Sequence, residues 1–364
     1  MSLNKNSGLK IVSIGGGTGL STLMAGLKTY ARPDAIFNKN QLPLIETLTA
    51  VVTVTDDGGS SGRLREEFQI LPPGDIRNCM VALAEDERLL TKLFQYRFES
   101  DGDLSGHSFG NIFLAALTGV TGDFLEAIKL TSEVLAIKGR IFPSTREDIS
   151  LLAELEDGRT VAGETRIVEA RSRIKRIWLS HQDCRPLPET LEAIEHADMI
   201  TIGPGSLYTS IIPNLLVHGI VEAIRSSKAI KVYICNIMTQ PGETEGFRVE
   251  DHIRALYECS PDLPLDYIIV NSAPISPALR GKYLADGAVQ VEPGPGLVMD
   301  GLTRIIEGKS HAAAPLDFAI VTGDLVNEND VVRHDPGKLA RLLLEIYRAE
   351  LDSLNGPALK GQAS

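Results

Sequence analysis

The feature that most constrains the fold is a series of seven short apolar segments rich in β-branched residues, at 9–14, 47–55, 174–179, 198–202, 230–235, 266–270 and 317–322. Their continuous rather than alternating hydrophobicity is typical of strands that are covered on both faces. Stretches with a helical pattern follow several of them, at 20–30, 207–226, 248–258 and 336–352. The order predicts an α/β fold with an open, mostly parallel sheet and helices on both faces.

Two stretches depart from this alternation. Residues 75–140 contain no convincing strand but several helical patterns, including 77–98 and 109–120, and we interpret them as a helical insertion. Residues 151–170 predict an antiparallel β-hairpin. Since no Pro- or Ser-rich linker separates these parts, we expect one α/β domain over residues 1–364.

The charge balance argues against several classes of partner. The formal net charge is −12, so we expect no binding to nucleic acid, which requires clustered positive charge. No run of about 18 apolar residues occurs, so no membrane span is expected. The four cysteines form no CxxC pair, which argues against a zinc site and a disulfide framework.

Both ends of the sequence are polar. Residues 1–8 lack the apolar stretch of a signal peptide, so the expected location is the cytoplasm. Residues 353–364 are small and polar, and they predict a flexible tail.

A glycine-rich turn joins the first predicted strand to the first helix. It comprises Gly15, Gly16, Gly17, Thr18 and Gly19, and Ser21 follows in the first helical turn. Glycines allow close approach of a phosphate, and a helix N-terminus offers free N–H groups. The turn lacks the third glycine of a dinucleotide fingerprint and the lysine of a Walker A loop. We therefore predict phosphate binding, and the alternative is a tight turn without a ligand.

Two adjacent carboxylates, Asp56 and Asp57, end the second predicted strand. At that edge of an open sheet they can hold a ribose hydroxyl, bind Mg²⁺ or accept a proton. The alternative is an acidic turn that caps the next helix. The acids follow the first glycine by about 40 residues rather than the usual 20 or so, which argues against NAD. The following loop contributes further candidates, Ser60, Ser61 and Arg65.

Two motifs in the helical insertion add polar side chains. Asp75 either caps a helix that begins with Ile76 or contacts a ligand, and Arg77 and Asn78 then face whatever lies at its start. All three are therefore ligand-binding candidates. His107 and Asn111 precede an apolar helix in the segment GHSFGN. A single histidine at a helix start is more often structural, but the combination with Gly-Asn favours a functional role.

Three later segments resemble further ligand loops. A second strand-to-helix turn carries Gly203, Pro204, Gly205 and Ser206, which suit an anion or a hydroxylated ring. Another strand is followed by Asn236, Thr239 and Gln240, whose groups suit a base or sugar unless they are simply solvated. Arg333 precedes the last helix and can reach a phosphate, whereas Asp335 is expected to cap that helix.

Taken together, six motifs resemble the gluconeogenesis-factor (YvcK-like) family, which is related to the 2-phospho-L-lactate transferases (CofD-like) of deazaflavin coenzyme biosynthesis. They are IGGGTGLS, TDDGGSSGRLR, PPGDIRN, GHSFGN, GPGSLYTS and NIMTQPGET. The resemblance covers roughly residues 9–350. It implies a Rossmann-like nucleotide-binding domain that binds a nucleotide-sugar such as UDP-N-acetylglucosamine in the cytoplasm. It also implies roles in carbon metabolism, cell shape and cell-wall synthesis.

The motifs leave two functions open. The first is a regulatory protein that binds a nucleotide-sugar without assured turnover, since no clear nucleophile is present. The second is a transferase that acts on a nucleotide-linked phospho-acid with Mg²⁺ at Asp56 or Asp57, and with His107 orienting or deprotonating the acceptor. Asp56, Asp57 and His107 are therefore the catalytic candidates, and Mg²⁺ is the one cofactor considered. A homo-oligomer and regulatory protein partners are both compatible with the sequence.

Overall fold

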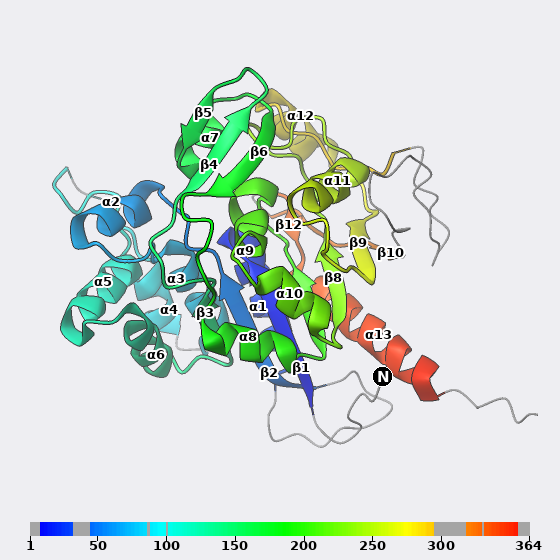
Figure 1. Ribbon diagram of the computed structural model, residues 1–364, viewed down its shortest axis with the longest axis horizontal. Coiled ribbons are helices and arrows are strands. Elements are labelled where there is room, and N and C mark those ends of the chain that lie inside the picture. The colour runs from blue at the N-terminus through cyan, green and yellow to red at the C-terminus, as the bar shows by residue number, and fades with distance from the viewer. Residues whose placement is uncertain are drawn as a thin grey trace, which may run out of the picture.

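A seven-stranded parallel sheet forms the centre of the computed structural model, in the strand order β10-β9-β8-β7-β1-β2-β3 (Figure 1). The structure describes residues 8–31, 44–85, 88–99, 101–294, 318–329 and 331–355. The strands are β1 (Leu9–Gly15), β2 (Ile45–Val52), β3 (Arg140–Pro143), β7 (Met199–Ile202), β8 (Ile230–Ile234), β9 (Tyr267–Asn271) and β10 (Ala319–Gly323). Most of their side chains are buried, as the continuous apolar runs predict. The predicted Rossmann-like α/β fold is confirmed.

The direction of winding reverses at the middle of the sheet. From β1 the chain adds β2 and β3 on one side, and it then returns to add β7 to β10 on the other. Right-handed connections therefore place the crossover helices of the two halves on opposite faces, and the C-terminal helix returns to the face of the first half. α1 (Gly17–Lys28) packs against α3 (Gly74–Leu83) and α13 (Pro336–Asn355), while α8 (Pro188–Glu195) packs against α10 (Ile220–Ser226). At this point the chain leaves β1 and β7 toward opposite faces of the sheet.

The helical insertion differs from the prediction at both ends. The run expected at 77–98 forms two helices, α3 and α4 (Arg88–Gln95). The insertion also contains α5 (Phe109–Thr121) and α6 (Phe124–Val134), and α2 (Gly59–Phe68) precedes it. The stretch then ends in β3, which pairs with β2 and forms one edge of the sheet. β3 has the sequence Arg-Ile-Phe-Pro, whose exposed first residue and terminal proline interrupt the continuous apolar run by which the other strands were recognised.

The hairpin belongs to a separate small sheet. β4 (Leu151–Leu155) pairs antiparallel with β5 (Thr160–Ala162), as predicted, but α7 (Glu164–Glu169) occupies the rest of the expected hairpin. β6 (Ile174–Leu179) pairs antiparallel with β4 and therefore does not join the parallel sheet. That prediction was wrong because exposed Lys175 and Arg176 mark a strand with one solvated face.

The expected helix at 207–226 is broken. It comprises a π-helical turn (Leu207–Ile211), α9 (Ile212–Leu215) and α10, and Gly219 with φ of 97° precedes α10. No single helix among the described residues is long and apolar enough to cross a membrane. The pair Leu207–Leu215 and Ile220–Ser226 meets that criterion only together, and it is bent by 71°.

The remaining elements lie near the carboxyl end of the sheet. α11 (Val249–Cys259) and α12 (Pro277–Ala285) follow β8 and β9, and β11 (Val326–Asn327) pairs with β12 (Arg333–His334). Asp335 accepts the N–H of Lys338 at 2.8 Å and caps α13, as predicted. The first residues of the predicted tail are helical up to Asn355, and 356–364 lie outside the described residues, as do 1–7 and Asp317.

The contact between α1 and α13 leads to a first prediction. A Cβ atom at Gly26 would overlap the carbonyl oxygen of Pro336, so Gly26→Ala must separate the two helices. We expect the free energy of unfolding to fall by about 1–3 kcal/mol in denaturant titrations. Gly119 in α5 has open space around it, and Gly119→Ala should raise stability by about 0.5–1 kcal/mol. Equal effects of the two changes would contradict this packing.

Candidate functional site

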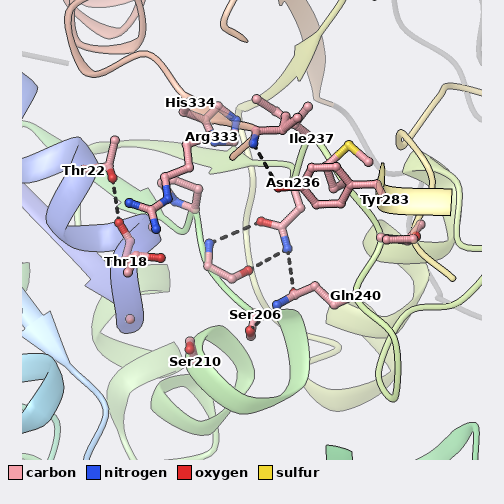
Figure 2. A pocket seen from close by; sticks show the side chains of 18 of the residues that line it. Thr18, Thr22, Ser206, Ser210, Asn236, Ile237, Gln240, Tyr283, Arg333 and His334 are labelled. Carbon is pink, nitrogen blue, oxygen red and sulfur yellow. Dashed lines mark hydrogen bonds between the residues drawn. The ribbon is translucent and has the colours of Figure 1, made fainter. Parts of the chain in front are cut away.

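A crevice of about 380 Å³ opens where the two halves of the sheet diverge (Figure 2). This is the topological switch point, at which open α/β sheets bind their ligands. The volume falls in the range of small-molecule sites. The predicted site residues that line it come from four segments and are Gly16, Gly17, Thr18, Gly19, Pro204, Gly205, Ser206, Asn236, Thr239, Gln240 and Arg333.

The glycine-rich turn forms one wall. Gly17 has φ of +60°, a conformation that favours glycine, and α1 begins there. A Cβ atom at Gly19 would overlap the carbonyl group of Pro204, so the absence of a side chain allows the two strand-to-helix turns to touch. The start of α1 therefore lies at the crevice with its partial positive charge, and its Gly17 N–H donates to the Asp75 carboxylate.

A network of side-chain amides forms the opposite wall. Asn236 donates to the carbonyl oxygen of Gly205 at 2.7 Å, and the Gly205 N–H donates back to Asn236 Oδ1 at 3.3 Å. Gln240 Nε2 donates to the Ser206 hydroxyl at 2.6 Å, as Figure 2 shows. Two loops that are about 30 residues apart in sequence are thus held together.

Glu243 reinforces this wall from behind. Its buried carboxyl group accepts the Tyr208 N–H and the Thr209 hydroxyl, both at 3.2 Å. Burial raises the pKa of Glu243 to about 7. The residue anchors the loop after β8 to the helix that follows the second turn.

The third wall brings two adjacent residues of β12 into the crevice. The exposed Arg333 extends toward Thr18 and Thr22 of α1 in Figure 2, where a phosphate bound by the helix start would lie. His334 is buried, and burial lowers its pKa to about 4, so its ring is neutral. Ten lining residues were not predicted from the sequence, and five of them have polar side chains, namely Thr22, Ser210, Tyr283, Asp286 and His334. The neighbouring Arg333 was a signal for His334, whereas nothing in the sequence places α12, which carries Tyr283, over the crevice.

Another group of the predicted residues forms a separate polar cluster. Ser60 at the start of α2 contacts His107 Nδ1 at 3.0 Å and accepts from Asn111 Nδ2 at 3.1 Å. None of the three lines the crevice, and all are buried. Burial, together with the charge of Arg63, lowers the pKa of His107, which favours the neutral ring that accepts the Ser60 proton.

The adjacent carboxylates Asp56 and Asp57 face different partners. Asp56 accepts the Gly58 N–H at 2.9 Å, and Asp57 accepts the N–H and hydroxyl of Thr165 at 3.0 and 2.9 Å. Within the described ranges, no group of three or more His, Cys, Asp and Glu side chains could hold a metal ion. These residues therefore do not form a complete protein-held metal centre.

Of the two roles considered for Asp75, capping of α3 is not observed. The helix already begins at Gly74, and the Asp75 carboxylate accepts the Gly17 N–H at 2.6 Å. Desolvation and the nearby Asp56 charge raise the pKa of Asp75 to about 6. A carboxylate thus lies behind the glycine-rich turn, on an N–H group at the start of α1.

Several other candidates lie outside the crevice. Arg65 forms an ion pair with Asp148 and donates to the Ile149 carbonyl at 2.6 Å, so it stabilises the loop before β4. The Ser21 hydroxyl donates to the Thr18 carbonyl, and Ser61 packs against Gly74. The two strand-end glycines, Gly15 and Gly203, lie behind the lining residues.

This geometry defines a doubly wound α/β protein with a polar, anion-compatible crevice at its switch point. The family model described as "2-phospho-L-lactate transferase CofD" matches residues 11–308. A Halalkalibacterium halodurans protein named gluconeogenesis factor is 47% identical over 337 residues, covering 92% of this chain and 95% of the relative. The Bacillus subtilis gluconeogenesis factor is 46% identical over 339 residues, covering 93% and 98%.

A solved structure agrees with these matches. The crystal structure of a Bacillus halodurans protein superimposes with a TM-score of 0.81 at 45% identity, covering 93% of this chain and 100% of that one. The chain therefore belongs to the gluconeogenesis-factor family of CofD-like proteins. The family resemblance seen in the six motifs is confirmed.

The position of Asp75 predicts a pH-dependent stability. Because its folded-state pKa of about 6 lies above the ordinary value of 3.8, the folded protein binds this proton more tightly, and the free energy of unfolding falls as pH rises between these values. Asp75→Asn removes this pH dependence. At pH 7 the free energy of unfolding of the variant should exceed that of the wild type by about 1–3 kcal/mol, and at pH 3.5 the two should be equal.

Denaturant titrations at the two pH values measure this difference. Asp101→Asn, at an exposed carboxyl group, is the control and should change neither value. A constant gain of Asp75→Asn at both pH values would contradict the burial of this charge.

Proposed function

We propose that the crevice binds a nucleotide-sugar such as UDP-N-acetylglucosamine, and that the bound state regulates carbon metabolism, cell shape and cell-wall synthesis. The observation that carries the proposal is the meeting of a glycine-rich helix start, an arginine and an amide-rich loop in one crevice. The relatives named gluconeogenesis factor support a metabolic role. Regulation of this kind requires a protein partner or a second copy of the chain, and both stay predictions.

Each part of such a ligand has a matching surface. The N–H groups at the start of α1 and the Arg333 guanidinium suit a diphosphate, because both are donors that carry positive charge. Asn236 Nδ2 donates to both Gly205 and Gln240, so the free donor is the second N–H of Gln240 Nε2. The two amide oxygens keep acceptor positions for hydroxyl groups of a sugar or for a base. Tyr283 adds an aromatic ring at the rim.

Calorimetry with UDP-N-acetylglucosamine tests the proposal. Arg333→Ala should weaken binding about 10- to 100-fold, because it removes a charged hydrogen-bond donor. Gly19→Ala should weaken it as well, by separating the two turns. Arg280→Ala, which removes an exposed arginine of α12 outside the crevice lining, is the charge-matched control. Heat with NAD or GDP but with no UDP-sugar would refute the proposal.

A second candidate is phospho-group transfer from a nucleotide-linked phospho-acid. The match to the 2-phospho-L-lactate transferase model favours it, as does the Asp56 carboxylate near Asp75. Mg²⁺ is often held by one or two carboxylates together with substrate phosphates, so Asp56 can serve without a complete protein site. His107 would then orient the acceptor, since its neutral ring can accept a proton.

Adjacent substitutions separate this candidate from simple binding. If Mg²⁺ bridges Asp56 and the ligand, Mg²⁺ should raise nucleotide affinity at least about tenfold in the wild type and in Asp57→Asn, but not in Asp56→Asn. Asp57→Asn is a suitable control because its partner is Thr165. Release of nucleoside monophosphate, assayed with a deazaflavin acceptor, reports turnover. Mg²⁺-independent binding without release would exclude the transferase.

A further inference from the structure

Two buried arginines in the helical part of the molecule differ in their partners. Arg65 and Arg77 are 9% and 8% exposed. Arg65 has the carboxylate of Asp148 as an ion-pair partner, whereas no carboxylate of the described residues forms an ion pair with Arg77. Since a buried charge is costly without a partner, Arg77 requires a different explanation.

The position of the Arg77 side chain is tightly defined. It extends from α3 across the start of α5, where a Cβ atom at Gly110 would lie 2.8 Å from Arg77 Cδ. Its Nη2 donates to Asn78 Oδ1 at 2.6 Å, and its buried Nε has no hydrogen-bond partner. The guanidinium therefore keeps a donor available in a buried position.

A second unpaired polar atom belongs to the residue after Gly110. Asn111 is 2% exposed, and its Nδ2 donates to Ser60 while its Oδ1 has no partner. Ser60 itself is saturated, because it also contacts His107 and the Ser108 N–H. The unused capacity thus consists of a donor on Arg77 and an acceptor on Asn111.

Two exposed arginines lie beside the loop that leads into α5, the helix that carries Asn111. Arg97 donates to the Gly106 carbonyl at 2.5 Å, and Arg63 donates to the Ser105 carbonyl at 2.6 Å, so both flank the loop before α5. The charge of Arg97 acts on both Arg77 and His107. Asp75 and Asp56 also act on Arg77, but from beyond ion-pair distance. Arg77 therefore has a second arginine as a close charged neighbour and, among the described residues, no carboxylate at ion-pair distance.

The geometry points to a second anion site at Arg77, flanked by Arg63 and Arg97, which binds a carboxylate or phosphoryl group that also offers a hydroxyl or N–H to Asn111. A guanidinium with a free edge suits such groups. The anion is either a separate small molecule or the far end of a ligand whose nucleotide lies in the crevice. The site rests on contacts outside the crevice and does not depend on the nucleotide proposal.

Thermal unfolding in inorganic phosphate, compared with chloride at equal ionic strength, tests the site. Phosphate should raise the wild-type Tm by about 2 °C at ten times its Kd. Arg333→Ala should keep part of the phosphate-induced rise in Tm, and adding Arg77→Met to Arg333→Ala should abolish it. In chloride, the double variant should have a Tm no lower than that of Arg333→Ala, because an unpaired buried charge is removed. Arg65→Met should lower Tm in chloride but keep the rise.

A surface variant keeps the test independent of folding. Arg97→Gln should leave Tm in chloride unchanged and weaken phosphate binding about 5- to 10-fold. Repeating the phosphate titration with saturating UDP-N-acetylglucosamine distinguishes a separate anion from the far end of the crevice ligand. Additive increases in Tm indicate a separate anion. Loss of the Arg77-dependent increase in Tm indicates that the far end of the crevice ligand occupies the site. A full phosphate response in Arg77→Met, or none in Arg333→Ala, would overturn the proposal.

Discussion

The close approach of Gly19 to the carbonyl group of Pro204 is the constraint on which the crevice depends. It joins the turn after β1 to the turn after β7, the two central strands, from which the halves of the sheet wind in opposite directions. Any side chain at Gly19 would separate them. The start of α1, the amide network and β12 can share one crevice only because these two turns are in contact.

Ionisable groups behind the crevice are held in costly environments. Asp75 lies against the glycine-rich turn with a raised pKa, Glu243 anchors the amide-bearing loop, and Arg77 lacks a carboxylate at ion-pair distance. Such groups reduce stability, and perturbed ionisable groups are concentrated at functional sites. Asp75 and Arg77 belong to the same turn of α3. Because Asp75 also contacts the glycine-rich turn, α3 connects the crevice to the cluster at Arg77.

Sequence patterns were most informative where one residue type has one physical role. Continuous apolar runs identified six of the seven strands of the parallel sheet, and glycines identified the turns at its switch point. The patterns were misleading where the role of a residue or strand depends on the segment with which it pairs. β6 has an apolar sequence but pairs with β4, and Asp75 resembles a cap although it accepts the Gly17 N–H. β3 was missed because an arginine and a proline bound its two central apolar residues. Arg65 resembles a phosphate ligand, yet its partner is Asp148.

The sequence alone determined the α/β class, the family and the loops that carry polar groups, because local periodicity and turn chemistry depend on neighbouring residues. Only the tertiary structure decided which of these loops meet. It divided one set of motifs into a crevice and a separate cluster, turned Asp56 and Asp57 toward different partners, and left Arg77 without a carboxylate. The reason is that side-chain partners are selected by packing between segments more than 30 residues apart, which no local pattern records.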